Sequence, residues 1–267
     1  MNPKHSLLEV LADLGLDLPE QTARDYLHRG GLKGCRPARK PLMSLVNQLK
    51  RQQWVRQWVA YDFNEVLFTD EKKWVCVNKG PQWVWRPVGA RNQPKYCVPT
   101  KQASGGGSVM VWGAISRKRT YPLIRIESTL NGQGHADLLN NFFKQWSVTP
   151  DGRPKGSRAS RPRSPWVFQW DNAAIHRSNV AEAMLSKWKV QVLPWPTQSP
   201  DLSPVENLWS LVSRKLRGQV FSNTDLLWAA VQREWNAVTP ETLGKLCDSM
   251  PSRLQAVCKS HGYPTRY

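Results

Sequence analysis

Three acidic residues stand where the sequence pattern predicts that a strand ends or a helix begins. Asp70 follows an apolar run at residues 66–68, and Asp171 follows another at residues 166–170. Glu206 opens a helical pattern, about 100° around the helix from the first residue of its apolar stripe. We therefore expect Asp70 and Asp171 at one edge of one sheet, with Glu206 facing that edge.

Carboxylates that converge repel one another, so a fold keeps three of them together when a cation neutralises the charge. Oxygen ligands without a histidine or cysteine cage favour Mg²⁺ or Mn²⁺. Two such ions about 4 Å apart can activate a water or a 3′-hydroxyl and stabilise the leaving oxygen of a phosphodiester. On the residues alone a simpler interpretation stays open, in which each acid is an ordinary cap or turn residue. Glu206, for example, suits the positive end of a helix dipole.

The elements that would position these acids follow from hydrophobic periodicity and turn residues. Strands are expected at residues 66–68, 74–77, 83–85, 109–115, 123–126, 166–170 and 190–193. Helices are expected around residues 138–146, 179–189, 205–216, 225–238 and 240–259. The pattern also becomes helical from residue 42, with Leu45, Leu49 and Val55 on or near one face. Strands in succession followed by alternating strands and helices predict an α/β fold, a mixed sheet flanked by helices.

The N-terminal region predicts two short helices separated by glycine. Leu7, Leu8, Leu11 and Leu14 recur at helical spacing before Gly15, and a second helix fits residues 19–29. This outline, over residues 1–34, is that of a partial DNA-reading helix-turn-helix, although any helical hairpin gives the same outline. The candidate DNA contacts are Arg24, His28, Arg29, Lys33, Arg36, Arg39 and Lys40.

Charge points to a polyanionic partner. Lys and Arg exceed Asp and Glu by 18, and a basic linker at residues 35–62 begins with a run that has no acid up to Arg56. Because each cation that neutralises a phosphate releases a counterion, we expect this linker to track nucleic acid. A merely soluble basic protein is the alternative that charge alone leaves open. Residues 150–165 are rich in Pro, Gly, Ser and basic residues, which predicts a surface loop.

The remaining composition narrows the class of protein. No apolar run is long enough to cross a membrane, and the N-terminus lacks the apolar core of a signal peptide, so we expect an intracellular protein. The five cysteines are widely spaced without a CxxC pair. That spacing argues against a disulfide framework and predicts reduced thiols.

Four segments resemble the Tc/mariner superfamily of DDE transposases. They are VLFTDEKKW at 66–74, GGGSVMVWG at 105–113, WDNAAIHRS at 170–178 and LPWPTQSPDLSPVENLW at 193–209. The last is long and specific, and the 34 residues between Asp171 and Glu206 are similar to the Tc branch. SMPSRLQAV at 249–257 also resembles that branch, so the similarity extends over about residues 20–267.

The resemblance implies an RNase H-like catalytic domain at residues 63–219, with a helical C-terminal part at 220–267. It implies a cut-and-paste DNA transposase in which Asp70, Asp171 and Glu206 bind two Mg²⁺ or Mn²⁺ ions. Asn172, His176 and Asn207 would support these ligands from outside. The implied partners are double-stranded DNA at transposon ends and at TA targets, and a second copy of the chain. No membrane partner is implied, and the implied location is the nucleus.

Departures from the family pattern keep two other functions open. Met1 falls inside what resembles the second of two usual helix-turn-helix units, Trp170 stands where Gln is common, and Ala174 where Pro is common. An inactive, co-opted DNA-binding protein derived from a transposon would fit these features. A general RNase H-like nuclease is the other alternative, and preferential cleavage of RNA–DNA hybrids would identify it.

Overall fold

The structure is a computed structural model that describes residues 7–32, 43–76, 107–127, 130–146, 167–173 and 175–267. The chain divides into two compact units, Met1–Lys40 and Pro41–Tyr267. None of the helices in the described ranges combines the length and the apolar character that crossing a bilayer requires. The expected strand at 83–85 and the insert at 150–165 lie outside the described residues.

The first unit contains the two predicted short helices, α1 (Leu7–Asp13) and α2 (Glu20–Arg29). Gly15 follows α1 with a φ of 63°, a left-handed conformation that suits glycine and ends the helix as predicted. Val10 of α1 and Ala23 of α2 are buried. The helical pair expected here is therefore present.

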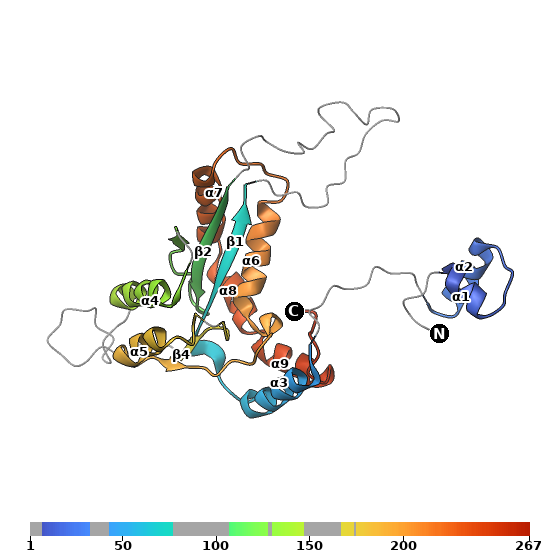
Figure 1. Cartoon of the computed structure of the whole chain (residues 1–267), viewed down its shortest axis with the longest axis horizontal. Helices are drawn as coiled ribbons and strands as arrows, with labels where there is room; N and C mark the ends of the chain where they lie inside the picture. Colours follow the sequence, from blue (N-terminus) through green and yellow to red (C-terminus); the bar gives the residue numbers. More distant parts are fainter. Residues whose placement is uncertain (1–6, 33–42, 77–106, 128–129, 147–166, 174) are drawn as a thin grey trace. The chain divides into compact units, whose positions relative to one another are not determined.

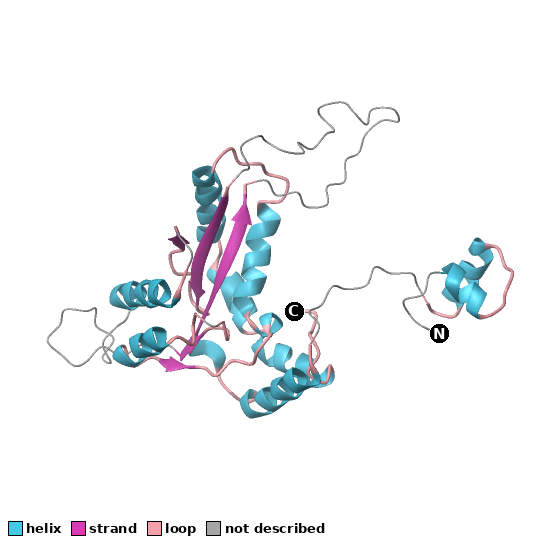
Figure 2. Ribbon diagram, in the orientation of Figure 1, coloured by secondary structure: helices cyan, strands magenta, loops and turns pink. Residues whose placement is uncertain are grey.

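The second unit is an α/β domain built around one mixed sheet (Figure 2). Its strands are β1 (Val66–Val75), β2 (Ser108–Ile115), β3 (Ile124–Ile126), β4 (Val167–Gln169) and β5 (Gln191–Val192). Its α-helices are α3 (Leu45–Trp58), α4 (Gly132–Trp146), α5 (Asn179–Lys187), α6 (Pro204–Lys215), α7 (Thr224–Asn236), α8 (Pro240–Cys247) and α9 (Met250–Lys259). Two 3₁₀ turns, η1 (Phe63–Glu65) and η3 (Pro200–Leu202), precede β1 and α6.

Strand β1 lies at the centre of the sheet, whose order is β3-β2-β1-β4-β5. It pairs antiparallel with β2 and parallel with β4, and β4 pairs parallel with β5. Alternate residues of β1 therefore point into two different cores. Leu67 packs with α4 and α5 on one face, whereas Val66 and Phe68 pack with α3 and α6 to α9 on the other (Figure 1).

Strand β1 is longer than the sequence predicted. We expected it to end at Asp70 and a second strand to begin near Trp74, but one strand runs from Val66 to Val75. Its partner β2 explains the difference, because the antiparallel ladder continues from Phe68 opposite Ile115 to Val75 opposite Ser108. Polar residues in the middle of β1 interrupt the apolar pattern without interrupting the backbone pairing.

Helix α3 turns a different face inward from the one that its leucines predicted. Leu45 and Leu49 are exposed, while Gln48, Arg51, Trp54 and Val55 are buried. Trp54 accounts for this choice, since its ring packs edge-on against Trp195, at 5.1 Å between centroids, and its indole N–H donates to the Pro194 carbonyl. The basic linker helix is thus part of the second unit.

Candidate active site

Asp70 lies in the middle of β1 and points to the face covered by α6. Its backbone pairs with Gly113 of β2, and its Oδ2 accepts a hydrogen bond from the indole Nε1 of Trp209, at 3.0 Å. A Cβ at Gly113 would collide with the Trp209 ring. Glycine at this position therefore leaves room for the ring that holds the Asp70 carboxylate.

Asp171 is brought beside Asp70 by the parallel pairing of β1 and β4. Phe68 pairs with Gln169 in this ladder, so Asp70 and Asp171 each lie two residues beyond a paired position. The Thr69 hydroxyl donates to the Gln169 carbonyl at 2.8 Å and continues the contact after β4 ends. The two carboxylates line the same cleft, at the point where β4 ends beside the middle of β1, whereas the sequence predicted that both strands end there.

Glu206 enters the site from the first turn of α6. Pro204 occupies the first turn as well, where its missing N–H is no loss. The Glu206 Oε2 lies 4.0 Å from Lys72 Nζ on β1, and about a third of each side chain is exposed. Glu206 is therefore less exposed than Asp171, whose side chain is 59% exposed.

All three acids line one cleft of about 440 Å³. The other lining residues come from β1, from the end of β4 and the segment after it, and from the loop before α6: Thr69, Gln169, Asn172, Ala173, Trp195, Pro196, Thr197, Gln198, Ser199, Pro200 and Ser203. The carboxylate oxygens of the three acids are not all within 4.8 Å of one another.

The electrostatics of the cleft favour a cation. Burial, followed by the negative charges of Glu206 and Glu71, raises the pKa of Asp70 to about 7, despite the hydrogen bond from Trp209. A carboxyl whose ionisation is opposed in this way gains most when a cation enters. The donors are all hard oxygen atoms, so the residues present fit Mg²⁺ or Mn²⁺.

Asp171 is held by His176, five residues further along the chain. His176 Nδ1 lies 2.7 Å from Asp171 Oδ1, and its Nε2 lies 3.2 Å from Glu71 Oε1. Burial lowers the pKa of His176, but the hydrogen bonds to Asp171 and Glu71 outweigh it and raise the pKa to about 10. The hydrogen bond from His176 keeps the pKa of Asp171 below its usual value. Trp170 stacks on the His176 ring, with 5.2 Å between centroids, which gives this unusual tryptophan a role.

Asn172 and Asn207, the other expected supporting residues, contact the loops around the cleft. Asn172 Nδ2 donates to the Trp195 carbonyl at 2.7 Å, which ties the segment after β4 to the loop before α6. Asn207 Oδ1 accepts from Arg253 Nη2 of α9, also at 2.7 Å. Neither residue touches the acids in these hydrogen bonds, so both act on the backbone that carries them.

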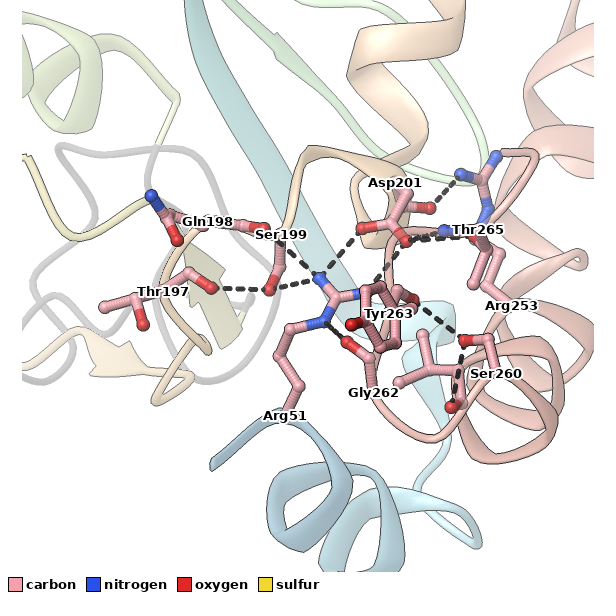
Figure 3. Close-up of polar contacts among 11 residues, drawn as sticks. Arg51, Thr197, Gln198, Ser199, Asp201, Arg253, Ser260, Gly262, Tyr263 and Thr265 are labelled. Atoms are coloured by element: carbon pink, nitrogen blue, oxygen red, sulfur yellow. Dashed lines mark hydrogen bonds and ion pairs between the residues drawn. The ribbon is translucent and has the colours of Figure 1, made fainter. Parts of the chain in front are cut away.

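The loop before α6 is fixed by Arg51, which reaches it from α3 (Figure 3). Arg51 is fully buried, and its guanidinium donates two hydrogen bonds to the Asp201 carboxylate, at 2.9 and 2.8 Å. It also donates to Ser199 Oγ at 2.6 Å and to the Gly262 carbonyl at 3.0 Å. The sequence interpretation was wrong for Arg51, because this residue of the basic linker is fully buried and unavailable to phosphate.

The C-terminal segment completes this buried network (Figure 3). The backbone N–H and the hydroxyl of Thr265 donate to Asp201 Oδ2, at 2.8 and 2.9 Å. Arg253 Nη1 donates to the Asp201 carbonyl at 2.8 Å, while its Nη2 holds Asn207. The residues on both sides of Glu206 are thus anchored to α9 and the chain end.

The candidate DNA contacts divide between the described and the undescribed residues. Arg24, His28 and Arg29 lie on α2 and are exposed. Arg24 Nη2 lies 3.7 Å from Glu20 Oε2 in a solvent-exposed ion pair. The Arg29 guanidinium lies 6.0 Å from the centre of the Tyr26 ring. The other four, Lys33, Arg36, Arg39 and Lys40, lie outside the described residues.

Comparison with known proteins decides the family. Residues 65–227 match the family described as DDE superfamily endonuclease, and residues 1–60 match a family described as transposase. The chain is 38% identical over 251 residues to the transposable element Tcb1 transposase of Caenorhabditis briggsae, covering 92% of this chain and 88% of that protein. It is 35% identical over 252 residues to the Tc1 transposase of Caenorhabditis elegans, with 93% and 88% covered. The chain belongs to the Tc1-like DDE transposases.

Solved structures support the fold of this transposase. The Mos1 transposase paired-end complex with left transposon end has a TM-score of 0.81 at 16% identity, covering 99% of this chain and 76% of that chain. The catalytic domain of Mos1 mariner transposase has a TM-score of 0.64, with 85% and 98% covered. The expected RNase H-like α/β fold is confirmed.

Sequence reasoning missed several residues that surround the acids of the transposase. Glu71 follows Asp70 in β1 and was not considered, although adjacent strand residues face opposite sides of the sheet. Its side chain therefore lies on the face opposite Asp70. Trp209 belongs to the apolar stripe that the sequence predicted for α6. The stripe did not reveal that the Trp209 indole N–H also donates a hydrogen bond to Asp70. Nothing in the sequence near His135 indicates that it meets Glu71 and His176, because the contact depends on how α4 packs on the sheet.

Proposed function

We propose that this transposase cuts DNA at transposon ends and joins the freed 3′-hydroxyl to target DNA at TA sites. The observation that carries the proposal is the single cleft lined by Asp70, Asp171 and Glu206, each of which lies in one of the segments that resemble the family. The middle of β1 supplies Asp70, the segment after β4 supplies Asp171, and the first turn of α6 supplies Glu206.

We propose further that Asp70, Asp171 and Glu206 bind two divalent ions, Mg²⁺ or Mn²⁺. When bound, such ions supply charge neutralisation at the scissile phosphate and a lower pKa for the attacking water or 3′-hydroxyl. The raised pKa of Asp70 supports the assignment, since burial and then the charges of Glu206 and Glu71 oppose its ionisation, and a bound cation would offset both.

The side chains around the acids would orient these ligands. Trp209 donates to Oδ2 of Asp70 and would fix the direction in which that carboxylate faces a cation. Asp171 Oδ1 receives His176 Nδ1 and the backbone N–H of Ala173, at 2.7 and 2.9 Å. Glu206 is held through its backbone by the loop that Arg51 and Arg253 fix. Asn172, His176 and Asn207 are accordingly proposed as supporting residues rather than ligands of these ions.

DNA is the partner that family and charge both indicate. The transposase-like segment at residues 1–60 and the net charge of +18 would bind transposon ends and target DNA. The solved relative is a paired-end complex, which supports a homodimer that holds two ends. We propose the nucleus as the site of action, because the DNA substrate is there.

Plasmid nicking tests the proposal directly. The purified chain is incubated with supercoiled plasmid and Mg²⁺ or Mn²⁺, next to Asp171→Asn, which preserves shape and removes charge. We expect nicking by the native chain only, with equal DNA binding by both proteins. Equal nicking by Asp171→Asn would overturn the assignment of the site. Binding without nicking by either protein would instead identify a co-opted DNA-binding protein.

A further inference from the structure

Two buried histidines converge on one carboxylate on the face of β1 opposite Asp70. Glu71 Oε1 lies 3.2 Å from His176 Nε2 and 3.7 Å from His135 Nε2. One ligand atom from each residue lies within 4.8 Å of the other two. His135 and His176 are 1% and 2% exposed, and their ring centroids are 4.4 Å apart. These residues come from α4, β1 and the segment after β4, so the fold alone assembles them.

The donor set differs in chemistry from that of the cleft. Two imidazoles and one carboxylate suit Zn²⁺ or Co²⁺, whereas Mg²⁺ prefers oxygen alone. Tetrahedral ligands about 2.0–2.2 Å from zinc lie about 3.3 Å from one another, so the present separations need only a small inward movement. His135 is already neutral, because burial, and then the charge of His176, lowers its pKa to about 3.

A hydrogen bond on the far side of His176 strengthens the case. Its Nδ1 lies 2.7 Å from the Asp171 carboxylate, which leaves Nε2 facing Glu71. Histidines that bind metals usually donate their other ring N–H to a carboxylate or carbonyl, which fixes the tautomer and the ring plane. A hydrogen-bond relay between Asp171 and Glu71 would need His176 only. His135 lies beside the same Glu71 oxygen, and a metal site accounts for the presence of this second histidine.

We propose that Glu71, His135 and His176 form a Zn²⁺ site separate from the Asp70–Asp171–Glu206 cleft. Zinc takes the place of the proton on His176 Nε2, so binding releases that proton, and a water completes the coordination. His176 of the zinc site contacts Asp171 of the cleft. Zinc bound to His176 would therefore fix the orientation of the Asp171 carboxylate. This inference stands whether or not the chain cuts DNA.

Cobalt provides a spectroscopic test on the full chain. Co²⁺ is added with excess Mg²⁺ present, and we expect the visible absorption of a tetrahedral site at one equivalent, displaced by Zn²⁺. His135→Gln and Glu71→Gln should each weaken Co²⁺ binding at least tenfold, while the exposed His261→Gln leaves it unchanged. Asp171→Asn, which removes the partner of Nδ1, should weaken binding by about 10–100-fold without abolishing it.

The outcomes separate this site from the alternatives. A band that is unchanged in both Glu71→Gln and His135→Gln, or that carries thiolate-to-cobalt absorption in the near ultraviolet, would overturn the proposal by placing the metal elsewhere. Absence of any tetrahedral band in the native chain would also overturn it and leave His176 as a proton-bearing bridge. Glu71 is partly exposed, so Glu71→Gln tests the ligand set even where His135→Gln disturbs the fold, which circular dichroism monitors.

Discussion

The Asp70 carboxylate is placed where the metal-free protein opposes its charge. Burial and the neighbouring Glu206 and Glu71 raise its pKa from 3.8 to about 7. Between these values the folded chain binds a proton that the unfolded chain has lost. In the absence of metal, the contribution of Asp70 to the free energy of unfolding should therefore be most favourable below about pH 4. It should decline as the pH rises to about 7. The group can contribute up to about 4 kcal/mol to this decline.

Thermal unfolding across this pH range checks the first prediction. Asp70→Asn, which keeps a similar shape but does not ionise, should be more stable than the native chain at pH 8 without metal. The difference should vanish near pH 4 and shrink when Mg²⁺ is added. The interpretation fails if Asp70→Asn has the same pH profile as the native chain.

Glycine at position 113 supports the same carboxylate from the neighbouring strand. Gly113→Ala places a methyl group against the Trp209 ring, whose indole N–H donates to Asp70. Overpacking of this kind typically costs about 1–3 kcal/mol. We expect lower stability in urea and weaker Mn²⁺ binding in calorimetry. Ala114→Gly, at the next position of β2, is the control: it lowers stability but should leave Mn²⁺ affinity unchanged.

At the scale of elements, the buried Arg51–Asp201 pair joins α3 to the loop that carries Glu206. The pair lowers the pKa of Asp201, although burial alone would raise it. Arg51→Met would leave the carboxylate buried without its partner, which typically costs about 3–5 kcal/mol. Arg56→Met, on the exposed side of α3, should cost little.

Urea unfolding of both variants measures these costs, and the double variant Arg51→Met with Asp201→Leu separates the pair from its surroundings. Removal of both charges should recover much of the loss, because no uncompensated charge remains. Equal destabilisation by Arg51→Met and Arg56→Met would show that the network contributes nothing specific.

The elements differ in how far the sequence determines them. Helix α6 and strand β2 follow from periodicity and from Pro204 at the helix start, and both were predicted within a residue or two. The full length of β1 was missed because its pairing with β2 is a long-range contact. The inward face of α3 was missed because Trp54 and Arg51 find partners about 140 and 150 residues away.

The site divides in the same way. The sequence could predict that Asp70, Asp171 and Glu206 line one cleft, because each acid stands in a local strand or helix pattern and in a motif that matches the family. The loop around Asp201 holds a buried ion pair whose partner lies on another helix, and no spacing in the sequence reveals it. His135 meets Glu71 and His176 only after α4 packs on the sheet.

On the scale of the whole molecule, the positive charge and the cleft have separable functions. An excess of 18 positive charges attracts phosphates irrespective of sequence, and each phosphate contact releases about one counterion. With 6–10 such contacts, affinity should fall by about 10³–10⁵ between 50 and 200 mM salt. Asp171→Asn leaves the basic residues in place, so its salt dependence should equal that of the native chain.

Arg24→Gln together with Arg29→Gln, on exposed α2, should reduce the slope of log affinity against log salt by about two if both contact phosphates. Fluorescence anisotropy with duplex DNA measures both slopes, and the exposed pair Lys187→Gln and Lys189→Gln is the matched control. An unchanged slope in the α2 variant would remove α2 from the DNA surface, and a shallower slope in Asp171→Asn would show that the cleft and the electrostatic binding surface are not independent.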